Sequence, residues 1–287
     1  HRLIRRQRQM CIRDRIMNFE KEQYYMAHIL MDGIDAMTER IDDEARAESI
    51  AAACESQDAV VRSVVKENKS VAPPKLYDLT TLQRDANRIF GFTAKQTLEY
   101  TQSLYEKKLV TYPRTDARVL STAVAKEIHK NIRGLSGFAN VQSYAAEVLE
   151  GTAWKKIAST RYVNDKQITD HYAIIPTGQG LLALRSVSAL SVKVYELIAR
   201  RFLSIFYPPA IYQKTTLVSK VQQESFFSSF RLLLSEGYLK VAGMPEENKK
   251  KDDTEDVKCD ENLLQALQKC KKGDILPVKG FSIKEGE

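Results

Sequence analysis

Residues 75–116 decide the fold, and they read KLYDLTTLQRDANRIFGFTAKQTLEYTQSLYEKKLVTYPRTD. A helix is expected from about residue 82 to 90, where Gly91 can adopt the left-handed conformation that ends many helices. Thr93 and Gln96 then form a capping box, in which each side chain accepts a hydrogen bond from the other residue's backbone N–H at the start of a second helix. Helix, glycine turn and helix predict a helix-turn-helix or winged-helix unit.

The second helix is expected to run to about Leu109, with one stripe facing the core that consists of Ala94, Leu98, Thr101, Tyr105 and Leu109. Tyr105 falls on this stripe, so we assign it to the core rather than to base stacking. The next residues, Val110–Tyr112, should be extended, because Pro113 disfavours the helical conformation in the residue before it.

Elsewhere the sequence predicts helices and strands without the regular alternation of a parallel sheet, and so an α+β fold in two or three subdomains. The remaining predicted elements are helices at 43–55, 122–133, 191–206 and 261–272, strands at 59–66 and within 210–242, and a strand-like C-terminal piece. Ser121 should cap the 122–133 helix and Gly134 should stop it. Pro73 and Pro74 interrupt regular structure and mark a nearby domain boundary.

The composition is that of a globular protein. The 287 residues are 43% hydrophobic and 28% charged, which excludes an intrinsically disordered chain. No apolar run approaches the roughly 18 residues of a transmembrane helix. The four cysteines never form a Cys-x-x-Cys pair, so neither a zinc ribbon nor a disulfide framework is indicated. We expect a soluble protein of a reducing compartment, without a metal site of its own.

The net charge of +7 is unevenly distributed. Residues 1–15 hold six arginines and one aspartate, and Met10–Arg15 resembles translated sequencing-adapter read-through. We therefore expect this basic leader to be non-native or disordered, and we leave it out of the fold. Residues 83–133 hold ten Lys or Arg against five Asp or Glu, which places a nucleic-acid partner there. The acidic 246–261 segment reads as a solvated loop.

The segment around Tyr112 combines groups suited to phosphoryl transfer. A tyrosine with an unperturbed pKa of about 10 is a poor nucleophile unless positive charge or a base lies nearby. If the backbone is extended, Arg114 projects from the same side as Tyr112 and its guanidinium fits a phosphate. Asp116 repeats the spacing and would orient Arg114. From spacing alone, a structural tyrosine in a turn beside a surface ion pair remains open.

At the level of whole motifs, residues 75–116 resemble the active-site region of type IA DNA topoisomerases, most closely the topoisomerase III branch. Residues 171–177, HYAIIPT, resemble that family's second motif, and residues 200–209 resemble the helix that follows it. The resemblance covers most of residues 16–287. It implies a toroidal, multidomain core in which a β-rich gate domain and a winged-helix-like domain build the ring.

The resemblance also implies functional roles. Tyr112 would attack a single-strand phosphodiester to form a 5′-phosphotyrosine, with strand passage and religation that need no ATP. Arg114 would steady the phosphate, and His171 would contact it or assist proton movement. Gln83, Thr115 and Arg118 would support the site as DNA contacts.

The same resemblance predicts how the chain is divided. We expect a leader at 1–15, the first part of the gate or arch domain at 16–80, the winged-helix-like tyrosine domain at 81–185, the returning part of the arch at 186–245, and a charged loop, helix and truncated strand at 246–287.

Two departures from the family pattern matter. Ala117 stands where the family usually has serine. The family's N-terminal acidic metal-binding (TOPRIM) domain is not found in the sequence, so we expect a fragment, and the family's Mg²⁺ would bind in that domain rather than here. The expected partners are single-stranded or negatively supercoiled DNA and a helicase or single-strand-binding protein, with no membrane, in a cytoplasmic, nucleoid-associated location.

Two other functions remain open from the residues. One is a non-catalytic winged-helix DNA-binding module in which Tyr112 is structural. The other is a different tyrosine nuclease, such as a recombinase or replication initiator, although no His-x-His metal pair occurs in the sequence.

Overall fold

The computed structural model describes residues 22–54, 57–243 and 270–286, together with 11, 13–14 and 17–18. Most of the leader, the acidic 246–261 loop and most of the predicted 261–272 helix lie outside these residues. The chain divides into two compact units. The strand-rich unit comprises His1–Glu67, Lys214–Leu232 and Asp256–Glu287, and the helical unit comprises Asn68–Gln213 and Leu233–Glu255. Among the described residues, no helix is long and apolar enough to cross a membrane.

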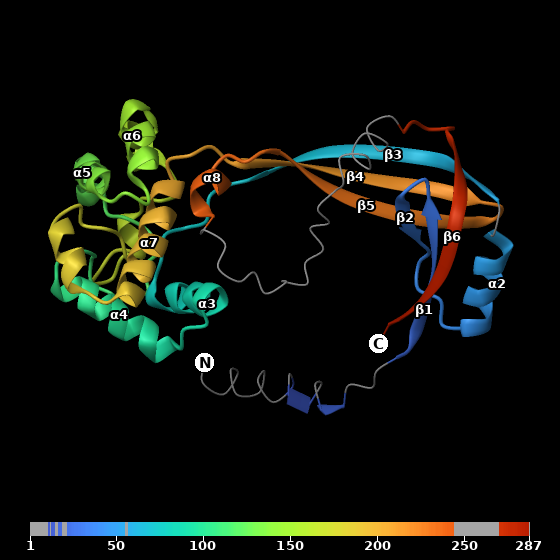
Figure 1. The fold of residues 1–287 in the computed structure, drawn as a ribbon, viewed down its shortest axis with the longest axis horizontal. Helices are drawn as coiled ribbons and strands as arrows, with labels where there is room; N and C mark the ends of the chain where they lie inside the picture. The colour runs from blue at the N-terminus through green and yellow to red at the C-terminus, as the bar shows by residue number, and fades with distance from the viewer. Residues whose placement is uncertain are drawn as a thin grey trace. The chain divides into compact units, whose positions relative to one another are not determined.

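The strands form one closed barrel in the order β1-β2-β5-β4-β3-β6 (Figure 1). They are β1 (Tyr24–Met31), β2 (Ile34–Met37), β3 (Asp58–Val71), β4 (Ala210–Val221), β5 (Glu224–Ser235) and β6 (Ile275–Gly286). The pairs β1–β2, β1–β6, β2–β5 and β3–β6 are antiparallel. The α+β class predicted from the sequence is confirmed.

The core of the strand-rich unit follows from the alternation of side chains along β1. Ala27, Ile29 and Met31 are buried, as expected when every second residue faces inward. Helix α2 (Glu44–Cys54) adds its buried face, which includes Ala47 and Ile50. The helix predicted at 43–55 is confirmed within a residue at each end.

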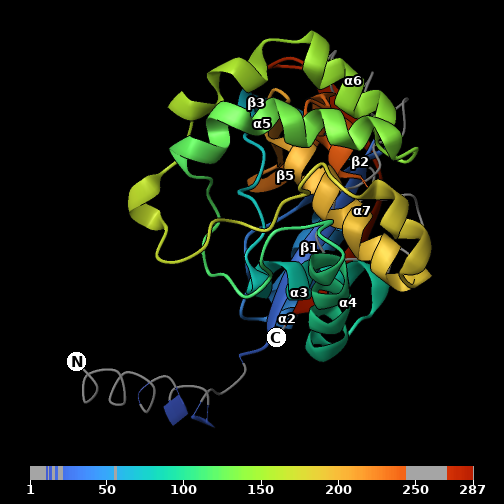
Figure 2. The ribbon, with the colours of Figure 1, turned by 90° about the vertical axis from the view of Figure 1, so that its left-hand side faces the viewer.

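The helical unit is built from short helices around one core. They are α3 (Leu79–Phe90), α4 (Ala94–Glu106), α5 (Thr122–Gly134), α6 (Gln142–Glu150), α7 (Ala189–Ser204) and α8 (Leu239–Ala242), with 3-10 turns η1 (Leu135–Gly137), η2 (Ala153–Ser159), η3 (Asp165–Gln167) and η4 (Leu181–Ser186). Helix α5 packs against α6, and α3, α4 and α6 pack against α7 (Figure 2). Helix α7 is therefore the centre of this unit.

Local capping fixes the first helices. Helix α3 begins three residues earlier than predicted, because Asp78 forms a capping box with Thr81. Gly91 ends it with a φ of 73°, as expected for a left-handed cap. The predicted capping box of Thr93 and Gln96 is confirmed at the start of α4.

Helix α5 ends at Gly134, as predicted, but the glycine there is required by a close backbone contact. Gly134 is the last residue of α5 and keeps a right-handed φ of −59°. A Cβ atom placed there would collide with the backbone of Gly178. Gly178 itself has a φ of 76°, and a Cβ on it would lie 2.7 Å from the carbonyl oxygen of Lys130. The two glycines therefore let the chain after residue 177 pass directly over α5.

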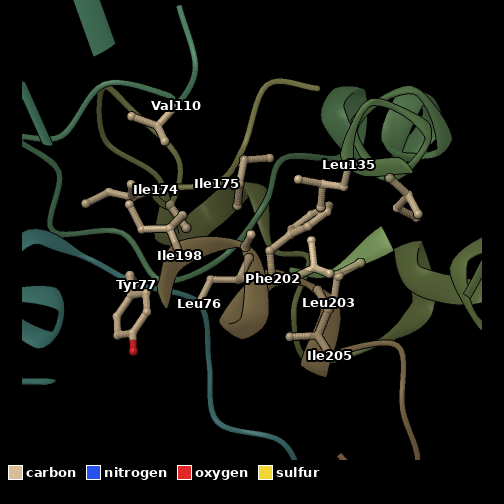
Figure 3. Close-up of a cluster of buried hydrophobic side chains, with 14 of the residues drawn as sticks. Leu76, Tyr77, Val110, Leu135, Ile174, Ile175, Ile198, Phe202, Leu203 and Ile205 are labelled. Atoms are coloured by element: carbon tan, nitrogen blue, oxygen red, sulfur yellow. The ribbon is translucent and has the colours of Figure 1, made fainter. Parts of the chain in front are cut away.

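The core of the helical unit joins α7 to segments far away in sequence. Figure 3 shows Ile198, Phe202 and Leu203 of α7 beside the 76–77 and 174–175 segments. The buried face of α7 belongs to this core, so residues 189–204 lie in the helical unit.

A buried polar cluster holds the segment that enters the helical unit. Arg201 pairs with Asp85 at 2.6 Å and donates to the Lys75 carbonyl oxygen. The Tyr77 hydroxyl donates to the same Asp85 carboxylate at 2.9 Å. Burial raises the pKa of the Tyr77 phenol, and the carboxylate of Asp85 adds to that rise. Tyr77 is therefore a neutral, structural hydroxyl.

Candidate active site

Tyr112 follows a short piece of chain that pairs with the predicted second motif. Val110 forms an isolated β-bridge with Pro176, and the Thr111 backbone N–H donates to the Ile175 carbonyl oxygen at 3.0 Å. The extended conformation predicted for Val110–Tyr112 agrees with this pairing. Residues that are about sixty positions apart in sequence thereby meet at the tyrosine.

The Thr111 side chain strengthens the same pairing. Its hydroxyl donates to the Ala173 carbonyl oxygen at 2.9 Å and accepts from the Ile175 backbone N–H at 3.0 Å. Ala173 and Ile175 are both fully buried. One hydroxyl therefore satisfies two buried backbone groups on the segment that follows His171.

Thr115 fastens the chain on the other side of the tyrosine. Its hydroxyl donates to the His171 carbonyl oxygen at 2.9 Å and accepts from the Ala117 backbone N–H at 3.1 Å. Its carbonyl oxygen accepts from the backbone N–H of Leu79 at the start of α3. Only 7% of Thr115 is exposed, so its side chain is engaged inside the protein.

These contacts bring the Tyr112 ring against the His171 ring, with centroids 4.4 Å apart and planes tilted by 41°. The edge of Tyr105 meets Tyr112 on another side, at 5.4 Å between centroids and 78° between planes. The predicted partners Tyr112 and His171 thus lie together. No hydrogen bond joins their side chains.

Tyr105 is not in the core, and the sequence prediction for it was wrong. Its side chain is 38% exposed. The buried face of α4 instead consists of Thr97, Thr101 and Leu104, and the helix ends at Glu106 rather than Leu109. Thr97 and Thr101 can be buried because each hydroxyl donates to a carbonyl oxygen one turn earlier in the helix.

A pocket of about 460 Å³ opens at this cluster. Most of its wall comes from the end of α4, the chain leading to Tyr112, and the second motif. The lining residues are Tyr105, Glu106, Lys108, Val110, Thr111, Tyr112, His171, Tyr172 and Thr177. Burial raises the pKa of Tyr172, so this phenol stays neutral in the pocket wall.

Arg114 is exposed and does not line this pocket. The chain bends at Pro113 and Arg114, so the continuous extended conformation that would align Arg114 with Tyr112 is interrupted. Asp116 is also exposed. The orienting role of Asp116 toward Arg114 stays a prediction.

The other predicted site residues make internal contacts. The Gln83 side chain donates to the Ala94 carbonyl oxygen at 3.0 Å and so joins α3 to the first turn of α4. The Arg118 guanidinium donates to the Leu76 carbonyl oxygen at 3.2 Å. Sequence reasoning missed Thr111 and Thr177, whose roles depend on pairing across the fold; their only signal was membership of the two motifs.

The described residues contain no group of three or more His, Cys, Asp or Glu side chains that could hold a metal ion. The residues at hand therefore do not fit the Mg²⁺ that the family resemblance implies. We derive no step of the chemistry through a metal.

Comparison with known proteins identifies the family. A family model described as DNA topoisomerase matches residues 10–287. DNA topoisomerase 3 of Bacillus licheniformis is 36% identical over 280 residues, which cover 95% of this chain and 37% of that protein. DNA topoisomerase 3 of Bacillus subtilis is 38% identical over 234 residues, covering 81% of this chain and 30% of that protein. The chain thus spans about a third of the length of these curated relatives.

A solved structure agrees in fold. Full-length topoisomerase I from Thermotoga maritima superposes with a TM-score of 0.63 at 21% identity, over 96% of this chain and 42% of that one. The family match extends across both compact units and includes the segments that bring Tyr112 and His171 together. The chain therefore belongs to the type IA DNA topoisomerase family.

Proposed function

We propose that this chain carries the nucleophile of a type IA topoisomerase, and that Tyr112 cleaves and reseals single-stranded DNA. The observation that supports this best is the placement of Tyr112 in the wall of an open pocket, packed against His171. A purely structural tyrosine of this fold looks different, as Tyr77 illustrates: it is 1% exposed and its hydroxyl is bonded to Asp85.

The proposed step conserves the energy of the broken bond. The Tyr112 oxygen loses its proton and attacks the phosphorus of a backbone phosphodiester, and the bond from phosphorus to the 3′ oxygen breaks. The DNA is left with a 5′-phosphotyrosine, and the 3′ oxygen takes up a proton as a free hydroxyl. Attack by that hydroxyl reverses the step, so religation needs no ATP.

His171 and Arg114 are proposed to act on the phosphate. Because the rings of His171 and Tyr112 pack without sharing a hydrogen bond, we favour phosphate contact by the imidazole over direct removal of the phenol proton. Either protonation state of imidazole has an N–H that can donate to a phosphate oxygen. Arg114 is exposed two residues from the nucleophile, where its guanidinium can reach the same phosphate.

The remaining predicted residues are proposed to support the site from within. The hydroxyl of Thr115 and the guanidinium of Arg118 are both engaged by carbonyl oxygens of the protein. Gln83 likewise holds α4 through the Ala94 carbonyl oxygen. We infer that their loss would act on Tyr112 through the position of the surrounding loops.

The substrate of the whole enzyme is proposed to be single-stranded or negatively supercoiled DNA. This rests on the family and on the excess of basic residues in 83–133. Because the chain spans only about a third of its relatives, the assay uses a chimera in which residues 22–286 replace the matching segment of the Bacillus licheniformis topoisomerase 3.

The chimera is incubated with single-stranded DNA labelled on the 3′ side of the expected break, and denatured protein is analysed for bound label. We expect a labelled adduct that disappears in Tyr112→Phe and persists in Tyr105→Phe, the matched neighbouring tyrosine. An adduct that survives Tyr112→Phe would overturn the assignment of the nucleophile. DNA binding without any adduct in the unsubstituted chimera would favour a non-catalytic binding module.

A further inference from the structure

Lys108 adopts an unusual backbone conformation at the end of α4. Its φ is 59°, in the left-handed region that glycine adopts without steric cost. Among the described residues other than glycine, only Asp32 and Gln222 also have positive φ, and both lie in hairpin turns between paired strands. Of these three described residues with positive φ, Lys108 is the one outside a hairpin turn, so its conformation needs a different explanation.

The hydrogen bonds around Lys108 define a helix-ending motif that normally contains glycine. The Lys108 backbone N–H donates to the Tyr105 carbonyl oxygen at 2.8 Å, and the Leu109 N–H donates to the Leu104 carbonyl oxygen at 2.9 Å. In this Schellman motif the left-handed position is usually glycine, because a side chain there costs free energy. A lysine at that position contributes nothing that the motif requires.

The second motif holds Lys108 in place. The Thr177 hydroxyl donates to the Lys108 carbonyl oxygen at 2.6 Å, and the Thr177 backbone N–H donates to the carbonyl oxygen of Leu109. Thr177 ends the same segment that begins at His171. The backbone of Lys108 is thus fixed by the elements that also place the Tyr112 and His171 rings.

The side chain of Lys108 is exposed in the pocket wall. Of the residues that line the pocket, Lys108 alone carries a permanent positive charge. No ion pair with another described residue engages its ammonium group. A strained backbone position that keeps a free cation beside the nucleophile points to a function in binding an anion.

We propose that Lys108 binds a backbone phosphate of the single strand, adjacent to the phosphate that Tyr112 attacks. The inference rests on the proposed function and deepens it by naming a substrate contact at the same pocket. It accounts for a lysine at a position where glycine would be less strained. It also predicts that stability and DNA affinity respond in opposite directions when the side chain is removed.

The test measures binding of a short fluorescent single-stranded oligonucleotide to the full chain by anisotropy, from about 50 to 200 mM salt. One phosphate contact on a single strand releases about 0.7 counterion, which corresponds to roughly fivefold in affinity at 0.1 M salt. Lys108→Gln should therefore weaken binding about fivefold and lower the salt slope by about 0.7. Lys107→Gln is the matched control, because Lys107 is an exposed neighbour outside the pocket.

Lys108→Gly separates binding from folding. It should lose the same affinity as Lys108→Gln while unfolding at an equal or higher urea concentration than the wild type. Equal losses of affinity in the Lys107 and Lys108 variants, or an unchanged salt slope in Lys108→Gln, would overturn the inference and leave the proposed function intact. Loss of both affinity and urea resistance in Lys108→Gly would also overturn it. Failure of the wild-type chain to bind the oligonucleotide would overturn this inference, whereas the proposed function is tested separately by the adduct of the chimera.

Discussion

Thr111 offers the sharpest perturbation of the site, because one hydroxyl joins the tyrosine segment to the His171 segment. Thr111→Val keeps the shape of the side chain and removes both hydrogen bonds of the hydroxyl. The buried Ile175 N–H and Ala173 carbonyl oxygen then lose their side-chain partner. An unsatisfied buried polar group costs about 1–3 kcal/mol, so we expect a loss of about 2–3 kcal/mol in the free energy of unfolding.

The same substitution should also displace Tyr112. A misplacement of about 1 Å in a reacting group can cost about 100-fold in rate, so adduct formation should fall strongly even where the variant remains folded. Unfolding in urea measures the stability, and the rate of covalent adduct formation by the chimera under native conditions measures the site. Thr111→Ser is the matched control, because it keeps the hydroxyl and loses only a methyl group.

Either of two results would show that the Thr111 hydroxyl does not join the two segments. One is a stability of Thr111→Val within about 0.5 kcal/mol of the wild type, below the cost of one unsatisfied group. The other is a loss of stability and adduct formation in Thr111→Ser as large as that in Thr111→Val.

Three further predictions address other parts of the helical unit. Arg114→Ala should reduce adduct formation by the chimera more than it reduces oligonucleotide affinity, and equal losses would make Arg114 a docking residue only. Gly134→Ala should collide with Gly178 and lower the free energy of unfolding by about 1–3 kcal/mol, which a lower urea midpoint would report; an unchanged midpoint would contradict the close approach. The hydrogen bond from Lys240 lowers the pKa of Glu147 in the folded protein. The pair therefore stabilises the fold above the unfolded pKa of 4.5, and this stabilisation is lost as pH falls through the lower folded value. Glu147→Gln should therefore lower the free energy of unfolding by less than about 1 kcal/mol near neutral pH, because solvent screens this half-exposed pair. The loss, measured by urea unfolding, should vanish in acid, and a loss independent of pH would contradict the pairing.

Sequence patterns predicted the local features of the helical unit best. The capping box of Thr93 and Gln96 and the left-handed Gly91 depend only on neighbouring residues, and both are found in the structure. The core face of α4 was predicted less well. The predicted stripe included Thr101, which is buried, but also Tyr105, which is exposed, and it missed Thr97; the hydroxyls of both threonines are satisfied by the helix itself.

The arrangement of the site depends on contacts that no local pattern contains. The hydroxyl of Thr111 meets Ala173 across 62 positions, and that of Thr115 meets His171 across 56. The motif resemblance placed Tyr112 and His171 in one site, and their rings do pack together. It did not indicate that Thr115 would be buried or that Lys108 would have positive φ, because both depend on how the second motif packs.

The role proposed for Tyr112 is that its oxygen forms the covalent bond to DNA. It is tested most directly by trapping the adduct formed by the chimera, digesting the protein and the DNA, and locating the attached nucleotide by mass spectrometry. We expect a nucleotide joined through its 5′ phosphate to the peptide that contains Tyr112, with a free 3′ hydroxyl on the released strand. A nucleotide attached to any other residue, or joined through a 3′ phosphate, would contradict it.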